Sequence, residues 1–140
     1  MSKTVLSFEI ELDVDLFCII SSVRDYRLCW MINKILNFNF IRQADIEINN
    51  QKKRTLSYFN LYLHEDELDR SKYYIVANKS LGEFLIPELK QVDYFMMVDD
   101  QSGSLDKNEL LSLMKNIAAI EAVFETNANN LKSKQNLILE

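Results

Sequence analysis

Hydrophobic and polar side chains alternate along several short stretches of this chain. In residues 4–12 every second position from Leu6 to Leu12 is apolar, and the positions between carry serine or glutamate. A period of two is typical of a β-strand with one solvent-facing side. Residues 56–64 show the same alternation. Further strands are predicted at residues 46–48, 73–78 and 121–126.

Residues 22–37 instead repeat their apolar positions every three to four residues, which predicts the main helix. Ser22 and Asp25 predict its start, because serine followed three positions later by an acidic residue resembles a capping box. Asn37 is expected to end the helix. The predicted buried side is made by Leu28, Cys29, Ile32, Ile35 and Leu36.

The second half of the chain predicts a short helix, a buried strand and a second long helix. Pro87 suits the first position of a short helix, where its missing N–H costs no hydrogen bond. The unbroken apolar run at residues 94–98 is typical of a central strand buried on both faces. Asp106 followed by Glu109 predicts another helix start. The apolar side of that helix is made by Leu110, Leu113, Met114 and Ile117.

These elements follow the order β-α-β-β-β-β-α-β. Short turns join neighbouring strands, which antiparallel pairing allows and parallel pairing does not. We therefore expect a two-layer α+β fold, in which two helices cover one face of a mainly antiparallel sheet of about six strands. The length of 140 residues suits one domain. We assign residues 1–126 to it and expect residues 127–140 to pack on the domain or on a partner.

Glycine content and net charge argue against two large functional classes. Gly82 and Gly103 are the two glycines, and they lie too far apart for the glycine-rich loop of a dinucleotide or P-loop site. We expect no cofactor. The net charge of -5 argues against nucleic-acid binding, which draws on lysine and arginine. The dense basic cluster at residues 52–54 is interpreted as a solvated turn; RNA binding by this cluster with Tyr58 and Tyr62 is a weaker alternative.

Cysteine placement and the N-terminal sequence predict a cytoplasmic protein. Cys18 and Cys29 both lie in apolar runs, and free buried cysteines suit a reducing compartment. The N-terminal stretch turns acidic and alternates, unlike a signal peptide. No apolar run approaches the roughly 18 to 20 residues that a membrane span needs, so we expect no membrane association.

No catalytic or metal-binding set is predicted. His64 is the single histidine, and the acidic residues 65–67 follow it. Adjacent residues at a strand end point in different directions, so a solvated turn is favoured over a metal site. Packing is likewise favoured over reactivity for Cys18 and Cys29, because a reactive thiol needs an electropositive, partly exposed setting.

Two groups of charged residues permit a functional interpretation beside a structural one. Glu88 and Asp93 are close enough in sequence for acid–base work, but helix-dipole and capping roles are favoured for them. Arg24 and Arg27 near the start of the main helix are candidates for an anion clamp. Pairing of these arginines with acidic side chains around the first strand is the favoured alternative.

Trp30 is the most informative single residue. At 100° per residue it lies away from the predicted buried side of its helix, on one arc with Val23 and Tyr26. Tyr58 and Tyr62 are expected on an exposed strand face, and tyrosine and tryptophan dominate interface energies. These five residues are the interface candidates of a homodimer or a protein complex; intramolecular packing is the alternative.

Residues 86–94 (IPELKQVDY) resemble the signature of the bacterial IPExxxVDY family. Residues 25–30 (DYRLCW) and 131–137 (LKSKQNL) are similar to its helix and its C-terminal segment. The resemblance implies a protein without an established activity whose gene lies near fatty-acid synthesis genes. It also implies acyl carrier protein or another fatty-acid synthesis component as a partner. The matching signature positions are Ile86, Pro87, Glu88, Val92, Asp93 and Tyr94.

Together with the interface candidates and the lack of a predicted catalytic set, this resemblance favours a non-enzymatic protein-interaction or housekeeping module that forms a homodimer. The alternative is a small-ligand-binding protein or enzyme that uses Arg27, Glu88 and Asp93 together. That alternative requires the three side chains to converge on one cavity.

Overall fold

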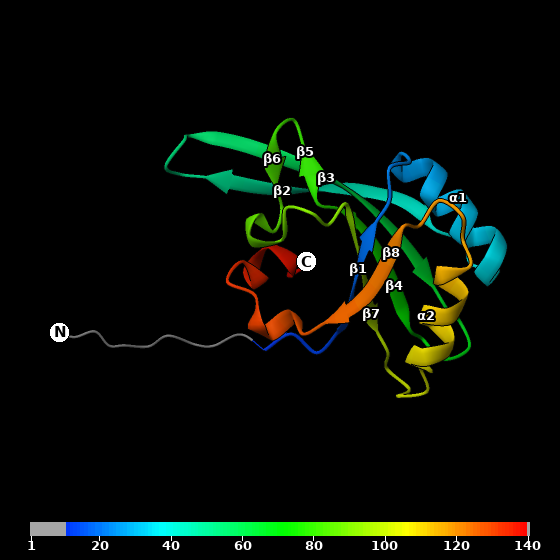
Figure 1. Cartoon of the computed structure of the whole chain (residues 1–140). Helices are drawn as coiled ribbons and strands as arrows, with labels where there is room; N and C mark the ends of the chain where they lie inside the picture. The colour runs from blue at the N-terminus through cyan, green and yellow to red at the C-terminus, as the bar shows by residue number, and fades with distance from the viewer. Residues whose placement is uncertain (1–10, 140) are drawn as a thin grey trace.

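The computed structural model describes residues 11–139. Within this range the chain forms strands, two α-helices and three short 3-10 helices (Figure 1). In chain order they are β1 (Asp15–Ile20), α1 (Asp25–Leu36), β2 (Ile41–Asn50), β3 (Thr55–Glu65), β4 (Lys72–Ala77), β5 (Lys79–Ser80), β6 (Glu83–Phe84), η1 (Pro87–Leu89), β7 (Tyr94–Asp99), α2 (Lys107–Lys115), β8 (Ala122–Thr126), η2 (Ala128–Asn130) and η3 (Lys134–Leu137).

Six strands form one sheet in the order β2-β3-β4-β7-β1-β8, and every neighbouring pair is antiparallel. β7 lies inside this sheet between β4 and β1, and all of its residues before Asp99 are buried. The prediction of a central strand from the unbroken apolar run is thus confirmed. β5 and β6 form a separate small hairpin.

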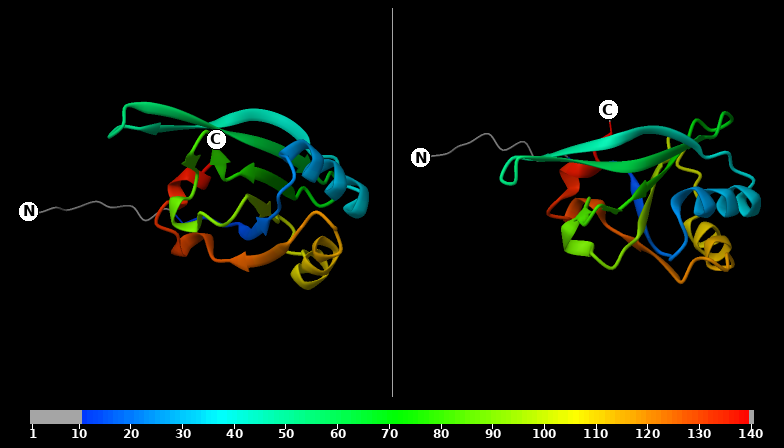
Figure 2. Two further views of the ribbon diagram at one scale, coloured as in Figure 1. Left: turned by 45° about the horizontal axis from the view of Figure 1, so that its top comes forward. Right: turned by 90° about the horizontal axis from the view of Figure 1, so that it is seen from above.

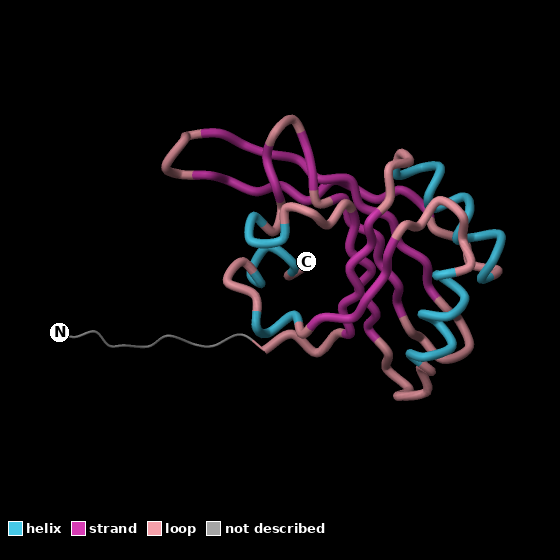
Figure 3. The backbone as a smooth tube through the Cα atoms, in the orientation of Figure 1, coloured by secondary structure: helices cyan, strands magenta, loops and turns pink. Residues whose placement is uncertain are grey.

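The two α-helices cover one face of the sheet, as predicted for an α+β fold. Leu28 of α1 and Met114 of α2 share a buried cluster with Phe17, Ile75 and Met96 of the strands. Figures 2 and 3 show both helices on one side of the sheet and the three 3-10 helices on the other.

The opposite face of the sheet carries a second buried cluster. Leu16, Phe95 and Met97 of the central strands contact Ile86 and Leu137, which come from the η1 region and from η3. A central strand whose two faces are both covered needs apolar side chains at every position. This requirement explains why β1 and β7 lack alternation. The C-terminal segment supplies part of the cover.

The strand predicted at residues 4–12 lies almost entirely outside the described residues. Residues 1–10 lie outside the described range, and Leu12 belongs to no strand: its backbone N–H and C=O both bond to the side-chain amide of Asn129. The first strand of the sheet is β1, at Asp15–Ile20. Its run of apolar residues has no period of two, because both of its faces are buried.

α1 confirms the main helix but corrects its start and one side chain. The N-cap residue is Arg24, which forms no side-chain cap, so the predicted Ser22 capping box is wrong. Asn37 ends the helix with a φ of 57°, as expected for a left-handed cap. Ile35 is 49 % exposed rather than part of the buried side. It lies at one edge of the apolar arc, in the last turn of the helix.

α2 begins as predicted: the Asp106 carboxylate accepts a hydrogen bond from the Glu109 N–H at 3.1 Å. Neither α1 nor α2 has the length and apolar character to cross a membrane, and the same holds for every helix of residues 11–139.

Candidate functional site

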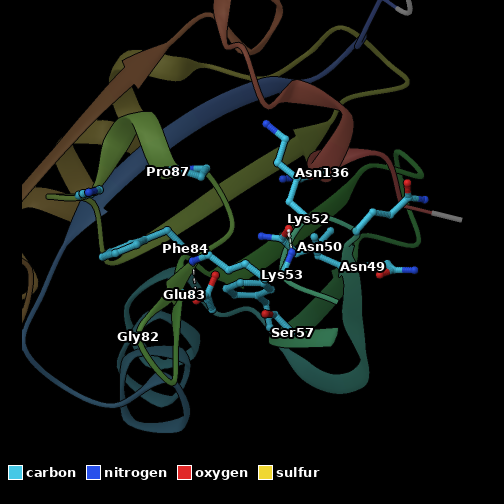
Figure 4. A pocket seen from close by; sticks show the side chains of 14 residues that line it. Asn49, Asn50, Lys52, Lys53, Ser57, Gly82, Glu83, Phe84, Pro87 and Asn136 are labelled. Atoms are coloured by element: carbon cyan, nitrogen blue, oxygen red, sulfur yellow. Dashed lines mark hydrogen bonds and ion pairs between the residues drawn. The ribbon is translucent and has the colours of Figure 1, made fainter. Parts of the chain in front are cut away.

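A cleft of about 670 Å³ lies between the β2–β3 hairpin and the chain from β6 to η1. Figure 4 shows hairpin side chains facing Glu83, Phe84 and Pro87. Phe59 lines the cleft from β3, and Asn136 reaches it from the C-terminal segment. Three segments that are distant in the sequence therefore meet here.

Lysines outnumber carboxylates in this cleft. Lys52, Lys53 and Lys90 line it, and among residues 11–139 Glu83 is the one lining carboxylate. Lys53 Nζ lies 3.5 Å from Glu83 Oε2. Lys90 Nζ lies 5.8 Å from the centre of the Phe84 ring, within cation–π range. The cleft is thus a basic feature of an acidic protein.

Exposed apolar side chains also occur on α1 and on the hairpin. Tyr26 is 64 % exposed, Trp30 57 % and Tyr58 47 %. Leu56 is exposed two positions before Tyr58, so it shares a strand face with it. That face is the α1 side of the sheet, because Tyr62, four positions further on, belongs to the helix-side cluster. We call Tyr26, Trp30, Leu56 and Tyr58 the exposed strip.

Hydrogen bonds join α1 to the β2–β3 hairpin, the two elements that carry the exposed strip. Asp25 Oδ2 at the start of α1 accepts from Asn60 Nδ2 at 2.5 Å and from the Tyr62 hydroxyl at 3.1 Å. Asn60 Oδ1 accepts in turn from Arg42 Nη2 of β2 at 2.8 Å. Burial, with the nearby Asp25 carboxylate, raises the pKa of Tyr62 to about 12. Helix and hairpin are therefore joined beside the strip.

Tyr62 itself is a correction to the predicted interface. It is buried, whereas an exposed face was expected. Val23 is half-buried and packs against the helix-side cluster. Of the five interface candidates, Tyr26, Trp30 and Tyr58 are exposed.

Residues 86–94 form a structural connection around Asn78, which is 0 % exposed. Asn78 Nδ2 donates to the carbonyl oxygens of Leu89 and Val92, at 2.9 and 2.8 Å. Its Oδ1 accepts from the Ile86 N–H at 2.8 Å. Ile86 and Val92 are themselves fully buried. One amide side chain therefore organises the whole turn that contains η1.

The charged and aromatic ends of this segment reach other parts of the chain. Asp93 Oδ2 accepts from the Ser21 N–H at 2.8 Å, and the Tyr94 hydroxyl donates to the Val23 carbonyl at 2.6 Å. Glu88 accepts from both the N–H and the hydroxyl of Ser133 at 2.8 Å. Partial burial opposes ionisation of Glu88, but these hydrogen bonds outweigh it and lower its pKa.

Arg27, Glu88 and Asp93 have different surroundings in the part of the chain that the structure describes. Asp93 lines a second cavity of about 330 Å³ together with Arg24 and Lys79, and neither Arg27 nor Glu88 lines it. Asp93 pairs with Lys79 at 2.7 Å. Among residues 11–139, Arg24 and Arg27 lie in no ion pair within 4 Å, so the expected pairing with acidic side chains is not found there.

The single histidine and both cysteines occupy packed positions. His64 Nδ1 accepts from the Asn39 N–H at 3.0 Å, and its ring stacks on Phe38 with centroids 4.2 Å apart. Burial lowers the pKa of His64 despite nearby carboxylates. Burial raises the pKa of the Cys18 thiol to about 11 and raises that of Cys29 as well. Both cysteines are free.

Within the described range, no three His, Cys, Asp or Glu side chains come together as a metal ion would require. Comparison of the chain with family models, with curated proteins and with solved structures yields no match. The resemblance to the IPExxxVDY family therefore depends on the residues of the sequence alone.

Sequence reasoning missed Asn78, Phe84 and Lys90. Asn78 follows the apolar strand β4 directly, and an asparagine at a strand end also suits an ordinary turn. Phe84 and Lys90 carry no local pattern, because their neighbours in the cleft include hairpin residues more than 20 positions earlier.

Proposed function

We propose that this chain is a non-enzymatic protein-interaction module that associates with a second copy of itself through the exposed strip. The observation that carries the proposal is the exposure of Tyr26 and Trp30 on α1 and of Tyr58 on the hairpin. Large aromatic side chains are the usual anchors of protein interfaces.

The positions of the reactive groups support a non-enzymatic role. The His64 ring is held by Asn39 and Phe38, so its Nδ1 lone pair is already used. The raised pKa values of Cys18 and Cys29 disfavour the thiolate, which is the reactive form. Two free, buried thiols also support our proposal that the module functions in the cytoplasm.

The size and rigidity of the strip support association with a like surface. A buried Tyr or Trp contributes about 150–250 Å², and a standard interface covers about 800 Å² per partner. About half of each of these three side chains is already buried in the monomer, so Tyr26, Trp30 and Tyr58 supply part of that area and neighbouring residues must supply the rest. The bonds of Asp25 to Asn60 and Tyr62 hold helix and hairpin in place, which lowers the entropy lost on association.

Sedimentation velocity over a concentration series tests this proposal. We expect the wild type to form dimers and Trp30→Ala to weaken dimerisation at least tenfold, or about 1.4 kcal/mol. Leu68→Ala is the matched control, since Leu68 is exposed in a loop outside the strip and its loss should leave the dimer unchanged. A wild type that stays monomeric at every concentration contradicts the proposal.

The family resemblance adds a second candidate partner. We infer from it that acyl carrier protein, or another component of bacterial fatty-acid synthesis, binds this module. Affinity purification of the tagged wild type followed by mass spectrometry tests this partner directly. Enrichment of that protein by the wild type and by Leu68→Ala, with its loss on Trp30→Ala, would assign it to the exposed strip.

A further inference from the structure

We propose that the cleft under the β2–β3 hairpin binds a nucleotide, with lysines on the phosphates and Phe84 against the base. This cleft is a different surface from the exposed strip, so binding in it does not depend on dimerisation. Its ligand must carry an anionic group and a flat aromatic ring.

The anionic requirement comes from the charge in the cleft. Lys52 and Lys53 approach from the hairpin tip and Lys90 from the residues that follow η1, so positive side chains stand on two walls. Glu83 offsets one of them through its contact with Lys53. Walls of one dominant sign attract counter-charged ligands into a concave site. A protein with a net charge of -5 has this basic hollow in spite of its overall charge.

The aromatic requirement comes from Phe84. Its ring is only half-buried and lines the same cleft as the hairpin lysines. Lys90 Nζ lies 5.8 Å from the ring centre. A positive charge that can bind a phosphate and an aromatic ring that can stack on a base are therefore neighbours. Every nucleobase has a flat π-face that stacks on an aromatic side chain without sequence preference.

Polar groups with fixed positions complete the lining. Asn50 Oδ1 accepts from the Lys53 N–H at 3.1 Å, which fixes the hairpin turn that carries Lys52. Asn136 Nδ2 donates to the Leu85 carbonyl at 2.8 Å, which fixes the C-terminal wall. Ser57 adds a hydroxyl. A volume of about 670 Å³ falls within the range of small-molecule sites, about 300–1,000 Å³.

The geometry also corrects the RNA alternative that the sequence suggested. That alternative joined the basic turn to Tyr58 and Tyr62, but Tyr62 is buried on the helix side of the sheet. Tyr58 lies four positions before Tyr62 and therefore points to the same face of β3. Its neighbours Ser57 and Phe59 point to the opposite face and line the cleft. The half-buried aromatic ring that shares the cleft with the hairpin lysines is Phe84.

Titration of the full-length protein with ATP at low salt, followed by calorimetry and by amide NMR shifts, tests the proposal. We expect saturable binding, with shifts at residues 49–53 and 82–90. Lys90→Gln and Phe84→Leu should each weaken binding at least fivefold. Glu83→Gln should strengthen it, because it removes the one lining carboxylate and releases Lys53. A gain of affinity cannot arise from loss of folding.

Controls separate the cleft from general charge effects. Lys115→Gln removes an exposed lysine from the end of α2, and its affinity for ATP should equal that of the wild type. Tripolyphosphate should bind more weakly than ATP, because it lacks the ring. A tetra-adenylate binding far more tightly than ATP would identify a nucleic-acid strand as the source of the nucleotide. The proposal would be overturned if neither ATP nor tetra-adenylate bound, or if tripolyphosphate bound as tightly as ATP. It would also be overturned if Lys115→Gln lost as much affinity for ATP as the cleft variants Lys90→Gln and Phe84→Leu.

Discussion

At the scale of single residues, the Asn78 side chain holds together the turn that contains η1. A buried polar side chain is tolerated only when its hydrogen bonds are made, and Asn78 makes three with the backbone of Ile86, Leu89 and Val92. Its own backbone N–H donates to the Asp93 carbonyl, and its carbonyl accepts from the Leu85 N–H. The segment that resembles a family signature is therefore held by a residue outside that signature.

Asn78→Ala is expected to destabilise the protein by at least about 2 kcal/mol. The substitution leaves the buried Val92 carbonyl and the buried Ile86 N–H without partners, at about 1–3 kcal/mol each. The Leu89 carbonyl still accepts from the Val92 N–H. Urea denaturation followed by circular dichroism measures the loss. Asn108→Ala, at an exposed position of α2, is the control and should change stability by less than about 0.5 kcal/mol. A loss below 1 kcal/mol for Asn78→Ala would refute the role that we assign to this side chain.

At the scale of elements, side chains from strands fasten the loops between them. His64 of β3 holds the loop between α1 and β2, since Nδ1 accepts from Asn39 and the ring stacks on Phe38. Asp93 and Tyr94 similarly tie the start of β7 to the β1–α1 loop. These bonds explain how a chain with two glycines and one proline keeps its loops in place.

The His64 contact predicts a pH-dependent stability. The folded-state pKa lies below its usual value of 6.5, mainly because burial disfavours the charged form. The neutral ring therefore stabilises the fold above pH 6.5, and this contribution is lost as the pH falls through the lowered folded-state pKa. The unfolding free energy of the wild type should drop between pH 7 and 5.

His64→Phe is the matched variant for this pH prediction. It keeps an aromatic ring against Phe38 but cannot titrate, so its unfolding free energy should fall less steeply over the same pH range. At pH 7 it should lose about 1 kcal/mol, because the Asn39 N–H loses its acceptor. Since His64 is the single histidine, parallel pH profiles for the two proteins would count against this account.

At the scale of the whole molecule, the sheet has apolar cover on both faces. The helices provide one cover, and the η1 region with the C-terminal segment provides the other. Leu137 of η3 is buried against the second face, and Glu88 holds the segment through Ser133. The last residues therefore belong to the domain core.

Leu137→Ala tests this integration of the C-terminal segment. Loss of a buried leucine typically costs about 2–5 kcal/mol, and we expect weaker folding with stronger binding of a hydrophobic dye such as ANS. Gln135→Ala, on the exposed side of the same short helix, should change neither quantity. Wild-type stability in Leu137→Ala would mean that the segment packs elsewhere, for example on a partner.

Much of the architecture could be predicted from local patterns. Alternation identified β3, and a helical period with an Asp106 cap identified α2. The unbroken apolar run identified β7 as central. Prediction failed for β1 because a strand buried on both faces has no period, and for Tyr62 because its partner Asp25 lies 37 positions away.

The sequence by itself determined the order of the elements and the α+β class, since periodicity records which side chains are shielded from water. The tertiary structure alone decided what shields them. It placed the C-terminal segment on the second face, turned Tyr62 inward and joined Lys52, Phe84 and Asn136 in one cleft. Such contacts depend on the spatial path of the chain, which no local pattern encodes.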